Sequence, residues 1–142
     1  MSRPEHVPIV NGIHLSHGTL ELRALARSKR FYKEFLGLTC VRHHEQAQIL
    51  ASSDQRWFIA CVQAGNGVHP QGRENRWFIA LHAWKDVDTA HDAAIQHQAE
   101  FDIQRIDPVT DTGHGRSFCL QDCDGNWWEI GYRASDVIDT GP

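Results

Sequence analysis

Glu129 is the residue whose type and position most clearly indicate chemistry in this chain. It lies in the heptapeptide Asp124-Gly-Asn-Trp-Trp-Glu-Ile130, where a carboxylate follows two aromatic residues in an otherwise apolar strand pattern. The segment Asp54-Gln-Arg-Trp-Phe-Ile-Ala60 nearly repeats this pattern but has Ile59 in place of the glutamate. A buried carboxylate requires a partner, and a metal ion is one way to supply it. The heptapeptide therefore indicates either a metal site or a pocket that has lost part of one.

The elements that would position Glu129 occur in two modules with the same internal order. The first module covers about residues 13–63, a Gly- and Pro-rich linker covers 64–75, and the second module covers about 76–133. Alternation predicts strands at 15–22, 39–41, 48–52 and 57–63, then at 76–83, 101–106, 117–121 and 127–132. Helical spacing predicts helices at 28–36, closed by Gly37, and at 86–98, with Asp86 or Asp88 as N-cap. We therefore expect one α+β domain over residues 1–142, built from two βαβββ modules with a flexible tail at 134–142.

Bulk composition argues against several function classes. The net charge is -4 without a basic block, which argues against a nucleic-acid platform. No apolar run approaches the roughly 20 residues of a membrane span, and the amino-terminal residues lack the apolar core of a signal peptide. The 4 cysteines have no C-x-x-C spacing and are expected to be free thiols. A cytoplasmic protein without nucleic-acid or membrane partners is expected.

Two motifs resemble a known superfamily. The stretch from His17 to Leu22, followed by Ser28, Phe31-Tyr32 and Leu36-Gly37-Leu38, resembles the opening of vicinal-oxygen-chelate proteins. The stretch from Phe118 to Ile130 is similar to their closing strand pair. That superfamily includes glyoxalase I, extradiol ring-cleaving dioxygenases and the bleomycin-binding proteins. The resemblance implies two curved mixed sheets around a central cleft, commonly in a homodimer, and leaves the reaction open.

The resemblance also implies where a divalent metal ion (Fe, Mn, Ni, Zn or Co) would bind. Matching offsets place metal ligands at His17 and Glu129, and at two further positions that Ile59 and Ile79 occupy in this chain. An extradiol-type site needs two histidines and one carboxylate, so the two isoleucines reduce the ligand set. The pair of His17 and Glu129 is then either part of a metal site or a hydrogen-bonded pair without metal. His82 would join only if a β-bulge turned it inward.

Strand alternation predicts which side chains line the cleft. Thr19 and Glu21 share the face of His17. The other predicted lining residues are aromatic or aliphatic: Trp57, Ile59, Trp77, Ile79 and Trp127. The tryptophans could stack on a planar ligand or fill the core of a curved sheet. Glu21 and His114 are candidate proton-transfer groups, while the alternatives are a salt bridge for Glu21 and a solvated turn position for His114.

Two functions follow from these residues. The first is a metal-dependent enzyme of the lyase, isomerase or ring-cleaving dioxygenase type, in which His17 and Glu129 hold the ion against vicinal oxygens of a small substrate. The second is a metal-free binding or resistance protein, in which an aromatic-lined pocket sequesters a small molecule. The carboxylate at position 129 favours the first function, and Ile59 and Ile79 favour the second.

Overall fold

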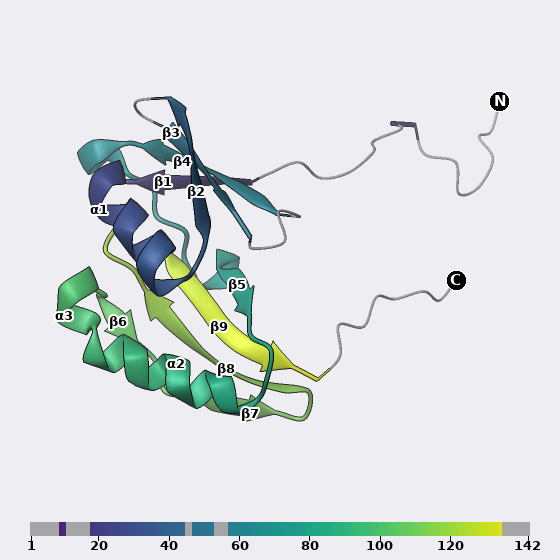
Figure 1. Ribbon diagram of the computed structural model, residues 1–142. Coiled ribbons are helices and arrows are strands. Elements are labelled where there is room, and N and C mark those ends of the chain that lie inside the picture. The colour runs from purple at the N-terminus through teal and green to yellow at the C-terminus, as the bar shows by residue number, and fades with distance from the viewer. Residues whose placement is uncertain (1–8, 11–17, 45–46, 53–56, 135–142) are drawn as a thin grey trace.

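The computed structural model describes residues 9–10, 18–44, 47–52 and 57–134. Two sheets, one from each module, make up the α+β fold that the sequence predicts (Figure 1). No helix in the described segments is both long and apolar enough to cross a lipid bilayer. The candidate metal ligand His17 lies outside the described residues, as does the predicted tail from residue 135 onward.

The first sheet contains four strands in the order β1-β4-β3-β2, of which only β1 and β4 run parallel. Helix α1 passes directly into a π-helical segment, η1, and Gly37 then ends it at φ +73, as expected for a glycine at a helix end. The bounds are β1 (Gly18–Leu22), α1 (Leu25–Arg30), η1 (Phe31–Phe35), β2 (Thr39–His44), β3 (Ala47–Ala51) and β4 (Phe58–Gln63).

The second sheet has the order β5-β9-β8-β6, and β7 pairs with β8. Short 3-10 turns, η2 (Gly65–Gly67) and η3 (Arg73–Asn75), lie in the linker. The bounds are β5 (Trp77–Ala80), α2 (Lys85–Gln96), α3 (Gln98–Phe101), β6 (Arg105–Ile106), β7 (Thr110–Thr112), β8 (Gly115–Gln121) and β9 (Trp127–Arg133). Figure 1 shows α2 lying along β8 and β9 on one face of this sheet.

Three local predictions for the second module are wrong. The predicted strand at 101–106 is reduced to Arg105–Ile106, because the chain is helical through Phe101 and then turns at Asp102 with a left-handed φ of 52. Neither Asp86 nor Asp88 caps α2, since the N-cap position is Trp84 and both acids lie within the first helical turn. Their charges still suit that end of the helix dipole. The predicted strand at 76–83 ends at Ala80.

A buried acidic turn between β8 and β9 joins the second module to the first. Asp122 is fully buried and accepts four hydrogen bonds, from the backbone N–H groups of Asp124 and Asn126, from Trp128 Nε1 at 2.9 Å and from Tyr32 Oη at 3.2 Å. Tyr32 belongs to the first module, so one carboxylate links the two. Burial raises the pKa of Asp122 to about 6, because water no longer solvates its charged form.

Two neighbours of Asp122 extend this connection to β1. Asp124 accepts the Arg23 backbone N–H at 2.8 Å and the Ser28 hydroxyl, and Asn126 donates to the Glu21 carbonyl at 3.0 Å. Gly125 lies between them at φ +90, where a side chain would be strained. The Asp-Gly-Asn sequence therefore holds the start of β9 against the end of β1, which fixes where Glu129 lies relative to the first module.

Candidate functional site

Glu129 projects from the middle of β9 and is bound by Arg76, which directly precedes β5, and by Ser117 of β8. Its Oε1 accepts a hydrogen bond from Arg76 Nε at 2.8 Å, and its Oε2 accepts one from the Ser117 hydroxyl at 2.6 Å. The Glu129 side chain is 14% exposed, against 36% for Arg76. The hydrogen bond that Arg76 donates to Glu129 raises the pKa of Arg76 above its ordinary value. Charge-assisted hydrogen bonds of this kind are the strong ones, so the carboxylate is held in one orientation.

The register of the second sheet defines what surrounds Glu129. Phe78 on β5 and Cys119 on β8 are its direct neighbours across the sheet. Directly opposed residues share a face, so these two side chains lie on the same face as the carboxylate. Burial raises the pKa of the Cys119 thiol, which keeps it in the neutral form that binds metals poorly.

A cavity of about 420 Å³ opens beside Glu129, within the range of small-molecule sites. His114 contributes to its wall, so the predicted proton-transfer residue and the predicted metal ligand do share one cavity. The residues that line it are Phe78, Thr112, His114, Gly115, Arg116, Ser117, Glu129, Tyr132 and Arg133. Gly131 lies between Glu129 and Arg133 on the same face of β9, where a Cβ would come within 2.5 Å of Ser117 Cβ.

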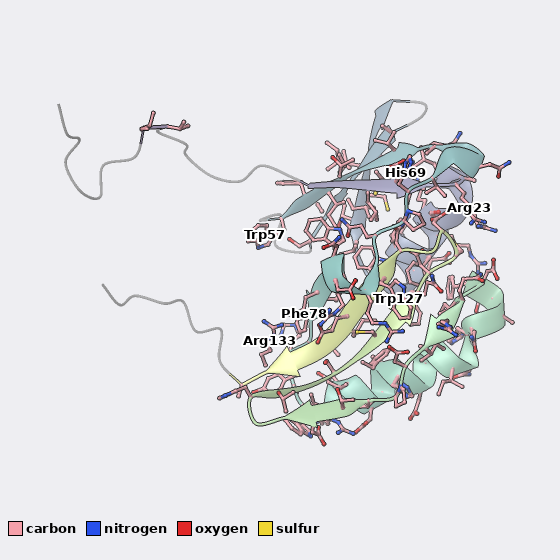
Figure 2. The ribbon with its side chains drawn as sticks, turned by 180° about the vertical axis from the view of Figure 1, so that it is seen from behind. Arg23, Trp57, His69, Phe78, Trp127 and Arg133 are labelled. Atoms are coloured by element: carbon pink, nitrogen blue, oxygen red, sulfur yellow. The ribbon has the colours of Figure 1, made fainter. Side chains whose placement is uncertain are left out.

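Arginines and aromatic rings alternate along this face. The Arg133 guanidinium lies 4.3 Å from the centre of the Phe78 ring, and the Arg73 guanidinium lies 3.9 Å from that of Trp127. Figure 2 shows Phe78 and Arg133 next to each other, with Trp127 further along the sheet. Because Arg73 covers its indole, the predicted pocket residue Trp127 is 8% exposed.

The prediction that Ile59 and Ile79 share the face of Glu129 is wrong. Ile79 pairs with Ile130, which is 3% exposed in the core, and both side chains pack on the helix-covered side of the sheet. Ile59 pairs with Gly18 and Leu50 and also belongs to the core. The positions that match Glu129 by sequence offset differ from it by one residue in strand register, and a shift of one residue moves a side chain to the other face of the sheet.

Four of the predicted pocket residues meet elsewhere. Trp57, Ile59, Trp77 and Ile79 line a separate cleft of about 740 Å³ between the two modules. Trp57 is 62% exposed, and the ring of Trp77 packs so closely on Gly18 that a Cβ there would lie 2.6 Å from it. His82 is exposed and borders the same cleft. The predicted aromatic residues and the carboxylate therefore line two different cavities, and Phe78 borders both.

The remaining predicted residues lie apart from the Glu129 cavity. Thr19 is exposed on β1. Glu21 contacts His69 of the linker, with 3.2 Å between Oε1 and Nδ1, and does not line the cavity beside Glu129. The alternative for Glu21 is a salt bridge with Arg56, Arg76 or Arg116. Arg76 pairs with Glu129 and Arg116 with Asp88 and Asp111, while Arg56 lies outside the described residues.

The side chains that the structure describes around Glu129 do not make up a standard metal site. Among the described residues there is no group of three or more His, Cys, Asp or Glu side chains able to hold a metal ion. Both oxygens of Glu129 are engaged, one of them by a guanidinium whose positive charge opposes a cation at that position. Its cross-sheet neighbour on β5 is Phe78. Alternation within β9 could have indicated the face of Glu129, but no pattern in the sequence indicates Arg76 or Ser117 as its partners.

Solved structures share the fold at low sequence identity. A mutant of the fosfomycin resistance protein FosX from Listeria monocytogenes, complexed with Mn(II) and 1S,2S-dihydroxypropylphosphonic acid, is 17% identical with a TM-score of 0.66, and the match covers 91% of this chain and 94% of that one. A possible glyoxalase from Bacillus cereus is 13% identical at a TM-score of 0.66, covering 84% and 98%. FosX from Mesorhizobium loti is 19% identical at 0.57, covering 87% and 93%.

The sequence itself matches one family model. No curated protein sequence matches the chain. Residues 14–130, from the segment before β1 to the residue after Glu129, match the model of the Glyoxalase/Bleomycin resistance protein/Dioxygenase superfamily. The superfamily resemblance of the two motifs is thereby confirmed, and the chain belongs to the Glyoxalase/Bleomycin resistance protein/Dioxygenase superfamily.

Proposed function

We propose that this protein binds a small organic molecule in the cavity beside Glu129, and that binding there requires no metal ion held by Glu129. The observation that carries the proposal is the engagement of both Glu129 oxygens, by Arg76 at 2.8 Å and by Ser117 at 2.6 Å. These contacts satisfy the carboxylate that the sequence suggested would need a metal. They also leave further lone pairs on its oxygens, which a ligand hydroxyl or amine could use.

The shape of the cavity supports a ligand of modest size. Its volume of about 420 Å³ suits a molecule with one ring or a short chain. Ser117 fills the space above Gly131, between Glu129 and Arg133, and Phe78 supplies an aromatic wall beside Glu129. A ligand would therefore place its polar groups near Glu129, Ser117 and Arg133 and its apolar part near Phe78. Sequestration of a small molecule, as in a resistance protein, follows from binding alone.

A metal-dependent enzyme is the second candidate, and the position of Glu129 on the last strand favours it. In this case His17 and Glu129 would hold a divalent ion (Fe, Mn, Ni, Zn or Co), which would supply Lewis-acid chemistry towards vicinal oxygens. His114, on the wall of the same cavity, would move a proton, whereas Glu21 has its contact with His69. The structural relative FosX was crystallised with Mn(II), which fits such a use of the fold. A homodimer in the cytoplasm is part of this proposal.

Ligand binding with and without metal distinguishes the two candidates. The protein is titrated with a library of small hydroxylated and aromatic fragments, first in EDTA and then with added Mn²⁺ or Zn²⁺, while amide NMR shifts are followed. We expect fragments to bind in EDTA and to shift the signals of Ser117, Gly131 and Phe78. Glu129→Gln should weaken this binding. Glu34→Gln is the matched control, because Glu34 also pairs with an arginine, at 2.7 Å, but on the first module.

The opposite result would support the metalloenzyme. In that case fragments bind only when a divalent ion is present, and elemental analysis finds near-stoichiometric metal that is lost in both His17→Ala and Glu129→Gln. Binding in EDTA that is unchanged in Glu129→Gln would contradict both assignments of the site.

A further inference from the structure

Arg133 is the one arginine around the Glu129 cavity that has no acidic partner among the described residues. Arg76 pairs with Glu129, and Arg116 pairs with Asp88 and Asp111, both at 2.6 Å. The Arg133 guanidinium instead lies over the Phe78 ring, with 4.3 Å between its central carbon and the ring centre. A cation–π contact does not use the N–H groups of the guanidinium as hydrogen-bond donors, so they remain available to a ligand.

The Arg133 guanidinium and the Glu129 carboxylate lie next to the same side chain, that of Phe78. Arg133 lies four residues beyond Glu129 on β9 and on the same face, with Gly131 between them. Phe78, which carries the guanidinium, is the direct cross-strand neighbour of Glu129. Donor groups and a carboxylate are thus gathered around one aromatic ring, on the wall of one cavity.

The two groups offer opposite hydrogen-bonding chemistry. Glu129 carries only acceptors, and its charge is balanced by Arg76. Arg133 carries only donors, and its planar fork matches a carboxylate, phosphonate or phosphate group. A molecule that satisfies both must present an oxyanion to Arg133 and a hydroxyl donor to Glu129.

We infer that the cavity beside Glu129 selects small hydroxylated organic anions. Arg133 binds the oxyanion, and Glu129 accepts a hydrogen bond from the hydroxyl. This inference rests on the proposed function, since it names the ligand class for the same cavity. Arg133 is then a specificity-determining residue, because neutral molecules of equal shape leave its donors to water.

Three probes of nearly equal shape test this assignment. Mandelate carries a hydroxyl and a carboxylate, mandelamide replaces the carboxylate with a neutral amide, and phenylacetate keeps the carboxylate without the hydroxyl. Each is titrated into the wild-type protein in EDTA at low ionic strength, and dissociation constants are taken from amide NMR shifts. We expect mandelate to bind about fivefold or more tightly than mandelamide, a modest ratio because Arg133 is exposed to solvent. Phenylacetate should also bind more weakly than mandelate.

Variants then assign each preference to its residue. Arg133→Gln should bring mandelate and mandelamide to equal affinity, whereas Glu129→Gln should remove the preference of mandelate over phenylacetate. Arg105→Gln is the matched control, an exposed arginine on β6 that does not line the cavity, and its probe ratios should equal those of the wild type. Circular dichroism of each variant checks that the fold is kept.

The inference is overturned if mandelamide binds as tightly as mandelate, if Arg133→Gln leaves the ratio unchanged, or if mandelate fails to bind at millimolar concentration. After any of these results, the proposed function still holds if other fragments, including neutral ones, bind to the cavity in EDTA. When no fragment of any charge binds in EDTA, the proposed function fails together with the inference.

Discussion

Replacement of Asp122 by asparagine tests whether the buried acidic turn holds the two modules together. The substitution keeps the size of the side chain but turns one acceptor oxygen into an N–H₂ group. The remaining oxygen can still accept from the backbone N–H groups of Asp124 and Asn126. The new amide would face Trp128 Nε1, which is fixed as a donor, and Tyr32 Oη, which can rotate to accept.

The magnitude follows from the hydrogen bonds that are lost. A buried donor left without a partner costs about 1–3 kcal/mol, and both the Trp128 indole and one amide hydrogen are left in this way. The substituted side chain is uncharged, so removal of a buried charge offsets part of the loss at neutral pH. We therefore expect Asp122→Asn to lower the free energy of unfolding by roughly 2–4 kcal/mol, from urea denaturation.

The pH dependence of the stability difference between wild type and Asp122→Asn is an independent test of the same interpretation. The pKa of Asp122 rises from 3.8 to about 6 on folding, so the folded protein binds more protons than the unfolded chain between these values. The stability that this group contributes is present below about pH 4 and is lost as the pH rises through about 6, by up to roughly 3 kcal/mol. The variant lacks this titration. Its deficit relative to the wild type should therefore be larger at pH 4 than at pH 7.

Two results would refute this reasoning. A deficit that does not change between pH 4 and pH 7 would show that Asp122 has an ordinary pKa in the folded protein. A deficit below about 1 kcal/mol at both values would show that its hydrogen bonds do not hold the turn. Asp86→Asn is the control, because Asp86 lies in the first turn of α2 and outside the turn network.

Three further predictions address packing and reactivity. Gly131→Ala should destabilise the protein by about 1–3 kcal/mol in urea denaturation and block ligand binding, because its Cβ would lie 2.5 Å from Ser117 Cβ. Gly67→Ala, with open space around the new methyl group, should do neither. Cys61, whose pKa burial raises to about 12, should react with a thiol reagent only on unfolding, whereas the partly exposed Cys119 should react in the folded protein, as mass spectrometry would show. Equal labelling of both folded thiols would contradict the burial of Cys61.

The sequence by itself determined the kind of fold and one chemical group. Alternation and helical spacing predict two βαβββ modules, and the structure and the family match confirm the α+β class. The glycine expected to end the first helix does so, at φ +73. Glu129 does lie within a strand, with its side chain only 14% exposed. These features are local, since each depends on residues within one element and on the period of that element.

The tertiary structure alone decided which faces meet and which side chains are partners. Sequence spacing put Ile59 and Ile79 beside Glu129, yet the register makes Phe78 its neighbour and places both isoleucines in the core. The sequence of a strand shows that side chains alternate between two faces, but not which set faces the core. Pairing with another strand decides that. Local sequence likewise does not identify the partner of Glu129, since Arg76 is separated from it by 53 positions in the chain.

The acidic turn shows the same division. Asp124, Gly125 and Asn126 are recognisable in the sequence as a turn, because these residue types favour turns through their backbone preferences. Their burial is not recognisable, since carboxylates are ordinarily exposed. Only the packed structure brings Tyr32, Ser28 and Trp128 to the acids of this turn, so that polar groups can lie at the junction of two modules with their hydrogen bonds satisfied. Local sequence thus specified the elements of this protein, and long-range packing specified its site.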